Sequence, residues 1–203
     1  MLLCDIGNTS YHFYDGENQY KKSVLDFDPT SLKEKIYFIS VNKALESLLL
    51  SLQNWINLSN FIDRSRYYES MGIDRVVALE TTSNAVIVDA GSAITVDVVR
   101  DGLFEGGFIY PGLKAMHETY KRISPALNYE FNFDLDLENL AKNSQDAISY
   151  GVLKLLYSEV LSYELPVILT GGDASSLKRV FLEATVEDRL IFKGMQNIIE
   201  REL

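Results

Sequence analysis

The sequence predicts an α/β fold made of two similar halves, each with a mixed sheet flanked by helices. One pattern, a strand, a glycine-containing polar turn, a second strand and a tight turn, occurs at residues 1–16 and again at residues 86–102. Helical periodicity separates the two copies, and mainly helical sequence follows the second. Strands that alternate with helices are typical of α/β proteins. We therefore expect one half over residues 1–83 and the other over residues 84–203.

The first copy begins with the apolar run 1–4, which leads into the turn sequence Asp-Ile-Gly-Asn-Thr at residues 5–9. The aromatic-rich run 11–14 follows, and Asp15-Gly16 favours a tight hairpin turn. These features predict a β-hairpin with a polar, glycine-containing turn.

The second copy repeats this order. The apolar run 86–88 leads into the turn sequence Asp-Ala-Gly-Ser at residues 89–92, and the β-rich run 94–99 follows. Asp101-Gly102 then supplies the same kind of tight turn. The repetition indicates a duplicated hairpin unit, and so two related halves.

Apolar residues at three-to-four spacing predict the helices. They are expected at residues 44–52, 75–83, 112–123, 144–161 and 174–182. The run 166–170 is apolar and ends in Gly171-Gly172-Asp173, which indicates a buried strand with a glycine-rich end.

Composition restricts the partners of the chain. A formal net charge of −10 makes the surface repel nucleic acid and anionic membranes, so we expect neither as a partner. The one cysteine, Cys4, lies in an apolar run and is interpreted as a core residue. No apolar stretch is long enough to cross a bilayer, and the chain has no basic leader region, so we expect a cytoplasmic protein.

The polar strand ends are suited to phosphate. Glycine allows a sharp turn whose backbone and side-chain donors can bind an anion, and Asp5 can hold Mg²⁺ through water. One such turn alone is more often an Asp-containing β-turn without a ligand. Two copies and the Gly171-Gly172 strand end favour nucleotide binding. The chain has no Walker A loop, so the nucleotide would be held differently.

The ordered motifs resemble a known family. Duplicated Asp-x-Gly hairpins with a late Gly-Gly strand end resemble the superfamily of actin, Hsp70 and sugar kinases, in which two ribonuclease-H-like halves clamp ATP. Within it, five segments resemble the signature of type III pantothenate kinase. They are residues 5–9, 72–75, 88–95, 106–112 and 170–173. The resemblance implies a homodimeric, ATP-dependent kinase for pantothenate, with the active site in the cleft between the halves.

The resemblance assigns the chemistry first to Asp74, in Gly72-Ile73-Asp74-Arg75, as the catalytic base that accepts the hydroxyl proton of pantothenate. Such a base suits a loose phosphoryl-transfer transition state. Arg75 is then expected to pair with the pantothenate carboxylate or a phosphate oxygen. The structural alternative is a helix N-cap or an Asp74–Arg75 ion pair.

The resemblance also implies the nucleotide and cation sites. Asp89 matches the position that binds K⁺ or NH₄⁺. The nucleotide-binding residues are expected to be Asp5, Ile6, Gly7, Asn8, Thr9, Ser10, Tyr11, His12, Ser92, Gly171 and Gly172. His12 is given no catalytic role, because a strand histidine near a cleft more often packs or forms hydrogen bonds.

The remaining substrate contacts that the resemblance implies are Tyr68, Gly72, Ile73 and Ser144. Tyr67 is an equal candidate to Tyr68 by chemistry. Ser144 replaces the threonine with which the family reaches the pantothenate site across the dimer interface, so the hydroxyl is kept and the methyl is lost.

Two other functions remain open at this point. The first is another small-molecule kinase of the superfamily, acting on a sugar or a carboxylate. The second is a non-catalytic regulator on the same scaffold, since the family resemblance extends to a transcription accessory protein. Retention of Asp5, Asp74 and Asp89 argues against the regulator, because a scaffold without catalysis has no physical need for these carboxylates.

Overall fold

The computed structural model describes residues 1–203, which form two compact units. The first unit contains Met1–Thr81 and Arg189–Leu203, and the second contains Thr82–Asp188. The sequence-based division falls close to the first boundary. It differs for residues 189–203, which belong with the first unit because their helix packs there.

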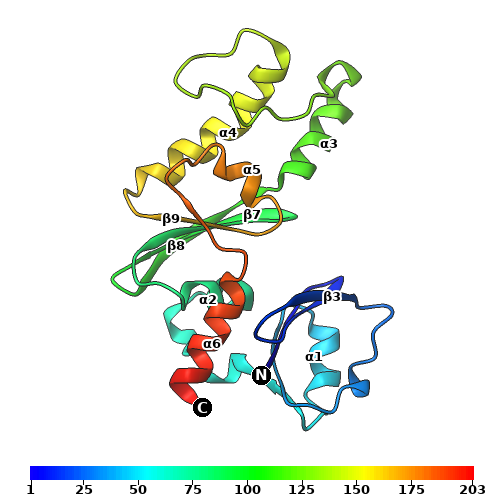
Figure 1. The fold of residues 1–203 in the computed structure, drawn as a ribbon. Coiled ribbons are helices and arrows are strands. Elements are labelled where there is room, and N and C mark those ends of the chain that lie inside the picture. Colours follow the sequence, from blue (N-terminus) through cyan, green and yellow to red (C-terminus); the bar gives the residue numbers. More distant parts are fainter. The chain divides into compact units, whose positions relative to one another are not determined.

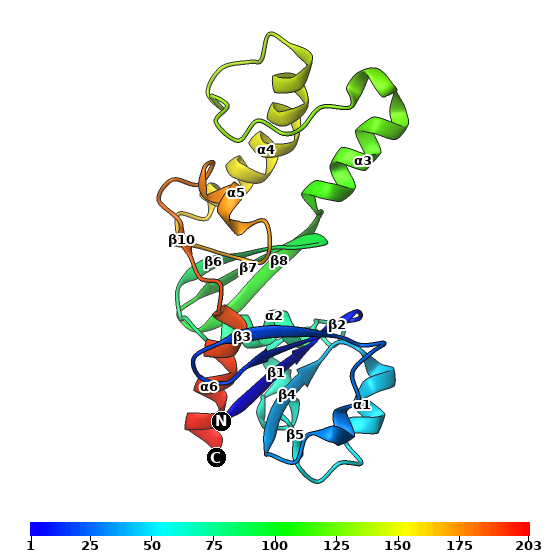
Figure 2. The ribbon, with the colours of Figure 1, turned by 45° about the vertical axis from the view of Figure 1, so that its right-hand side comes forward.

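The first unit is built on a five-stranded mixed sheet (Figures 1 and 2). Its strands are β1 (Leu2–Ile6), β2 (Ser10–Tyr14), β3 (Gln19–Ser23), β4 (Ile36–Ser40) and β5 (Trp55–Asn57), in the spatial order β3-β2-β1-β4-β5. Strands β1, β2 and β3 pair antiparallel, whereas β4 and β5 continue the sheet parallel to β1.

Helices cover both faces of this sheet. Alternate β1 residues, including Cys4 and Ile6, point into an aromatic-rich core with Leu49 of α1 (Lys43–Leu49). Asn42 caps α1, because its Oδ1 accepts the N–H groups of residues 44 and 45. Cys4 is fully buried, which confirms its interpretation as a core residue.

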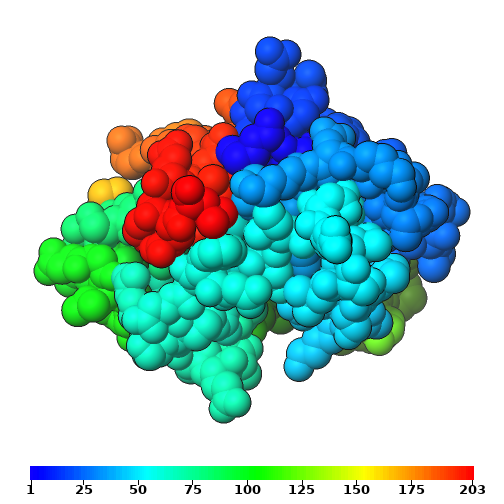
Figure 3. All heavy atoms as spheres, turned by 90° about the horizontal axis from the view of Figure 1, so that it is seen from below, coloured from blue at the N-terminus to red at the C-terminus, as the bar shows by residue number.

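The opposite face is covered by α2 (Ile73–Leu79) and α6 (Leu190–Glu202), and Figure 3 shows the C-terminal helix beside the N-terminal residues. Gly194 makes the close approach of α6 to α2 possible, since a Cβ there would lie 2.0 Å from the carbonyl oxygen of Val77. Short 3-10 helices connect the other elements, at Pro29–Ser31, Leu58–Phe61 and Arg64–Arg66.

The second unit has the same sheet topology. Its strands are β6 (Ala85–Ala90), β7 (Ala93–Arg100), β8 (Leu103–Pro111), β9 (Val167–Thr170) and β10 (Thr185–Val186), in the order β10-β9-β6-β7-β8. The first three strands pair antiparallel, and the last two are parallel to the first. The corresponding strands therefore occupy the same places in both sheets, which confirms the prediction of two similar halves.

In the second unit, α3 (Leu113–Ile123), α4 (Ser144–Ser162) and α5 (Ala174–Lys178) lie on one face of the sheet (Figure 1). Their apolar residues pack on the alternate β6 and β7 positions that include Val88 and Val96. A 3-10 helix, Pro125–Leu127, follows α3. The predicted tight turn is present, because Asp101 and Gly102 both have positive φ, 51° and 74°. No helix in either unit has the length and apolar character that a membrane crossing requires.

Candidate functional site

The first hairpin turn exposes polar groups at the end of β1. Gly7 N–H donates to the carbonyl of Ser10 at 3.0 Å, which closes the turn. Asn8 and Thr9 are exposed at its tip, and Asp5 is partly buried just before it. The turn can therefore present main-chain and side-chain donors to an anion.

Not every residue expected to bind nucleotide can do so through its side chain. Ile6 and Tyr11 are fully buried in the core on the α1 side of the sheet, so only their backbone can take part. His12 lies on the other face, opposite Asp5, and its ring packs edge-on against Phe192 at 5.0 Å. Burial and the cross-strand Lys21 lower the pKa of His12. His12 is thus at least a packing residue.

The second hairpin turn is closed in the same way, because Gly91 N–H donates to the carbonyl of Ala93 at 3.0 Å. Ser92 is exposed at this turn. Gly112, at the start of α3, packs closely against the backbone of this turn. A Cβ at Gly112 would lie 2.4 Å from the carbonyl oxygen of Ser92 and 2.5 Å from that of Gly91. The glycine-rich segment 106–112 therefore has a physical link to the predicted phosphate turn.

Asp89 lies against the glycine-rich end of β9. It pairs in register with Thr170, and the following residue, Gly171, has a φ of +87°. A Cβ at Gly171 would lie 2.4 Å from Oδ1 of Asp89 and 2.6 Å from the carbonyl oxygen of Ala90. The same Ala90 carbonyl accepts the N–H of Asp173 at 2.9 Å. Only glycine fits at residue 171, both for backbone conformation and for space.

Asp74 lies in the first turn of α2, where a carboxylate is stabilised by the helix dipole. Gly72, not Asp74, occupies the N-cap position, so the N-cap alternative is wrong. Oδ1 of Asp74 accepts the N–H of Arg75 at 2.9 Å. A Cβ at Gly72 would lie 2.4 Å from this Oδ1, so the glycine leaves room for the carboxylate to fold back over the start of the helix.

The structure separates the roles of the two tyrosines. Tyr68 is 45% exposed and its hydroxyl accepts a hydrogen bond from Nη1 of Arg75. Tyr67 is buried and its hydroxyl donates to Oε1 of Glu80 at 3.0 Å. Of the pair, Tyr68 is therefore the one that lies with Arg75 and the Gly-Ile-Asp-Arg motif.

A pocket of about 460 Å³ adjoins this motif within the first unit. Ser40 at the end of β4, Arg64, Gly72 and Ile73 contribute to its wall. Arg64 is held there because its Nη2 donates to the carbonyl of Met71 at 2.7 Å. Its lining combines charged and polar side chains, such as Lys43 and Arg64, with apolar ones, such as Val41 and Met71.

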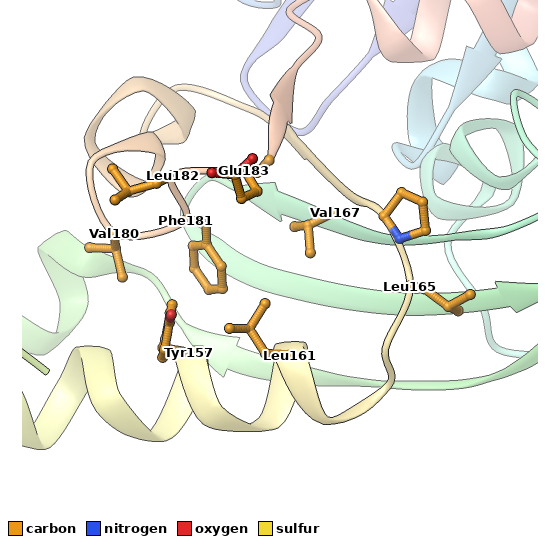
Figure 4. A pocket seen from close by; sticks show the side chains of 10 residues that line it. Tyr157, Leu161, Leu165, Val167, Val180, Phe181, Leu182 and Glu183 are labelled. Carbon is orange, nitrogen blue, oxygen red and sulfur yellow. The ribbon is translucent and has the colours of Figure 1, made fainter. Parts of the chain in front are cut away.

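A different pocket, of about 300 Å³, lies in the second unit and is mainly apolar (Figure 4). Tyr157 and Leu161 of α4 line it together with Phe181 and Val167. None of the predicted site residues contributes to it. Ser144 lies elsewhere, exposed at the first residue of α4, which Asn143 caps through the N–H of Asp146.

The predicted residues thus lie in several local groups, which include the two hairpin turns. In the first unit, Gly72, Asp74, Arg75 and Tyr68 lie together around the start of α2. In the second unit, Asp89 lies against Gly171. Sequence reasoning included Thr170 in the segment 170–173 but gave no role to Glu80, which lies in none of the motifs.

No group of three or more acidic, histidine or cysteine side chains is arranged to hold a metal ion. Mg²⁺ usually takes one or two carboxylates together with substrate phosphates and water. The single, partly buried carboxylate of Asp5 beside an exposed turn fits such a site.

Comparison with solved structures first defines the class. The fold is similar to that of a candidate 2-dehydro-3-deoxygalactonokinase from Sinorhizobium meliloti, with a TM-score of 0.61 and 12% identity over 98% of each chain. It is also similar to that of MreB5 of Spiroplasma citri bound to ADP, with a TM-score of 0.51 and 9% identity over 96% of this chain and 94% of the other. The chain therefore has the two-lobed α/β fold of actin-like and sugar-kinase ATPases.

Sequence comparison gives the family. The family model for type III pantothenate kinase matches residues 40–163. A type III pantothenate kinase of Sulfurimonas denitrificans is 55% identical over 99% of this chain and 98% of its own length. That of Helicobacter hepaticus is 41% identical over the whole of both chains. The chain belongs to the type III pantothenate kinase family, which confirms the prediction of an ATP-dependent kinase.

A solved structure from Campylobacter jejuni is also similar, with a TM-score of 0.86 and 37% identity over 98% of each chain. That protein is described as a conserved candidate transcriptional activator of the Baf family. A curated Campylobacter jejuni relative that is 38% identical over 98% of this chain and 97% of its own length is a type III pantothenate kinase.

Proposed function

We propose that this chain transfers the γ-phosphate of ATP to the primary hydroxyl of pantothenate, giving 4'-phosphopantothenate, the first step of coenzyme A biosynthesis. The observation that carries the proposal is the full-length similarity to curated pantothenate kinases. The arrangement of Gly72 and Asp74 at the start of α2 agrees with it, because it holds a carboxylate beside a pocket that Gly72 and Ile73 help to line.

Asp74 is the proposed base. Its Oδ1 is engaged by the N–H of Arg75, and Oδ2 makes no hydrogen bond. Oδ2 can therefore accept the hydroxyl proton of the alcohol as its oxygen attacks the γ-phosphorus. Because the transition state is loose, aiming the alcohol matters as much as removing its proton.

Arg75 and Tyr68 are the proposed anchors for the substrate. The guanidinium can form paired hydrogen bonds to the pantothenate carboxylate, and the Tyr68 hydroxyl fixes its orientation. Gly72 and Ile73 line the adjoining pocket. Anchoring the carboxylate end holds the hydroxyl of the substrate at a set distance from Asp74.

The two hairpin turns are proposed to bind the phosphates of ATP, through residues 5–12 and Ser92, with Gly171 and Gly172 beside the nucleotide. Asp5 would hold Mg²⁺ through water, and Asp89 would hold K⁺ or NH₄⁺. Bound there, these cations neutralise phosphate charge as it develops. This local positive charge is needed because the protein carries a net charge of −10.

The proposed assembly is a cytoplasmic homodimer in which Ser144 of one protomer reaches the pantothenate site of the other. The exposed position of Ser144 at the start of α4 supports this proposal, since its hydroxyl is accessible. Sedimentation of the purified protein tests the dimer, and a monomer at micromolar concentration would contradict it.

The function is tested by ADP release from purified protein supplied with ATP and Mg²⁺, with and without pantothenate. Parallel reactions in potassium, ammonium and sodium buffers test the monovalent cation. A sugar or sugar acid in place of pantothenate tests whether the chain is another small-molecule kinase of the superfamily. We expect turnover only with pantothenate, and only with potassium or ammonium. A folded protein that turns over a sugar acid instead, or neither acceptor, would show that the substrate is wrong.

A further inference from the structure

Glu80, the residue that follows α2, has a carboxylate that joins several parts of the first unit. Its side chain is only 5% exposed. Oε1 accepts hydrogen bonds from Oη of Tyr67 at 3.0 Å and from Nη1 of Arg66 at 3.4 Å. Oε2 accepts from Nη1 of Arg201, on α6, at 2.7 Å. A buried carboxylate is stable only with such partners, so these donors fix both the side chain and the segments that carry them.

Glu80 is connected to the candidate substrate site through two adjacent tyrosines. The backbone at Tyr67 is extended, with φ −131° and ψ 158°, so successive side chains point in opposite directions. Tyr67 turns inward to Glu80 at the C-terminal end of α2, and Tyr68 accepts a hydrogen bond from Arg75 at its N-terminal end. The two tyrosine hydroxyls therefore hold residues 67 and 68 against both ends of α2, the helix that carries Asp74.

The Tyr67 hydroxyl acts as a permanent donor in this arrangement. Burial and the neighbouring Glu80 raise the pKa of Tyr67 to about 12. The hydroxyl therefore keeps its proton at neutral pH, and the contact with Glu80 persists across the physiological range.

We propose that Glu80 is a positioning residue for substrate binding. It holds Tyr67, and through the adjoining Tyr68 it holds the guanidinium of Arg75 in the orientation that receives the substrate carboxylate. This inference rests on the proposed function, because it concerns the same site, and it adds a residue that does not touch the substrate.

A purely structural role for Glu80 is the alternative. Arg201 and the bond from Nδ2 of Asn197 to the Glu80 carbonyl, at 3.0 Å, join α6 to the end of α2. If Glu80 served only this purpose, its loss would lower stability without a selective effect on pantothenate binding. Arg201→Gln removes the ion pair between Arg201 and Glu80 and leaves the hydrogen bond between Tyr67 and Glu80 in place.

The experiment compares steady-state kinetics of Glu80→Gln, Tyr67→Phe and Arg201→Gln with the native enzyme. The NH₂ group of glutamine is a donor and cannot accept the hydrogen bonds that the second carboxylate oxygen accepts. We expect KM for pantothenate to rise about tenfold in Glu80→Gln and Tyr67→Phe, with KM for ATP and kcat within about twofold. Arg201→Gln should lower only the melting temperature. Tyr20→Phe, at an exposed tyrosine of β3, is the control for hydroxyl removal and should change none of these three constants.

Hydrogen exchange gives a readout that does not depend on activity. The N–H groups of Tyr67 and Met71 donate to the carbonyls of Arg64 and Tyr68, at 3.1 and 3.0 Å. Residues 64–75 should exchange faster in Glu80→Gln and Tyr67→Phe than in Tyr20→Phe.

The outcomes separate this inference from the proposed function. Native enzyme that phosphorylates pantothenate, with an unchanged pantothenate KM in both variants, overturns the positioning role alone. Absence of pantothenate turnover in the native protein refutes the proposed substrate. In that case, unchanged exchange over residues 64–75 also overturns the coupling, whereas faster exchange supports it.

Discussion

Oδ1 of Asp74 occupies the space that a side chain on Gly72 would need, since a Cβ at residue 72 would lie 2.4 Å from it. The spacing of the Gly-Ile-Asp-Arg motif therefore has a steric explanation. Glycine permits the carboxylate to fold back over the start of α2 and accept the Arg75 N–H. Asp74, the proposed base, can take this orientation because residue 72 has no side chain.

Gly72→Ala should reduce kcat by about tenfold or more, because the new methyl group forces the Asp74 carboxylate into another rotamer. The clash is with the end of a flexible side chain, so the melting temperature should change little. The measurement is a pair of kinetic and thermal-unfolding curves.

A double-mutant cycle provides the control for this prediction. If Gly72 acts through Asp74, Gly72→Ala combined with Asp74→Asn should lose no more activity than Asp74→Asn alone. Fully additive losses would show that Gly72 contributes independently of the carboxylate.

Gly171→Ala should lower the free energy of unfolding by roughly 1–3 kcal/mol, because residue 171 has a positive φ and its Cβ would meet backbone atoms of Ala90. Gly172→Ala is the matched control, since a Cβ at Gly172 would meet nothing within 4 Å. Urea denaturation of both variants decides the matter. Equal stability of the two would contradict the packing described for the end of β9.

Stability should fall as the pH drops below about 6.5, partly because of His12. Burial and Lys21 lower its pKa from the usual 6.5, so the unfolded chain binds a proton more readily than the folded one. The contribution is fully present above the unfolded pKa and is lost as the pH falls through the folded pKa. The groups around the ring are Lys21 and Asp5 on neighbouring strands, the Gln19 amide and Phe192 of α6. His12→Gln should reduce the difference in unfolding free energy between pH 7.5 and pH 5.5. An unchanged difference in unfolding free energy would show that groups other than His12 cause the pH dependence.

The Cys4 thiol should not react with a disulfide reagent in the native protein. Burial, with a smaller effect from the Asp5 carboxylate, raises the pKa of this thiol and removes it from solvent. One equivalent should react once urea unfolds the chain. Rapid modification under native conditions would mean that the first sheet opens readily.

Much of the fold could be predicted because the signals were local. The repeated turn sequences after β1 and β6 predicted the duplicated hairpins, and both closed as expected around Gly7 and Gly91. The helices began within two residues of their predicted positions, although α1, α2 and α5 ended earlier than expected. Weak ends of this kind depend on tertiary contacts, which periodicity does not report.

Other parts depended on long-range contacts. Strands β3, β4 and β5 were not predicted, and β3 is largely exposed, so it lacks the apolar alternation that marks a strand. Helix α6 was not predicted, and its residues were placed in the second half, because only the packing of α6 on α2 through Gly194 shows where they belong. The contacts of Glu80 with Tyr67 and with Arg201 join residues that are far apart in the chain, and no local pattern could indicate them.

The most direct test of the account is phosphate transfer to pantothenate by the native enzyme and by Asp74→Asn, followed by ³¹P NMR in the presence of ATP, Mg²⁺ and potassium. Asparagine keeps the shape of the side chain but cannot accept the hydroxyl proton. The account predicts a phosphopantothenate signal from the native enzyme and a rate at least about a hundredfold lower from Asp74→Asn, with the fold intact. Native turnover with an undiminished rate in Asp74→Asn would contradict the assignment of the base.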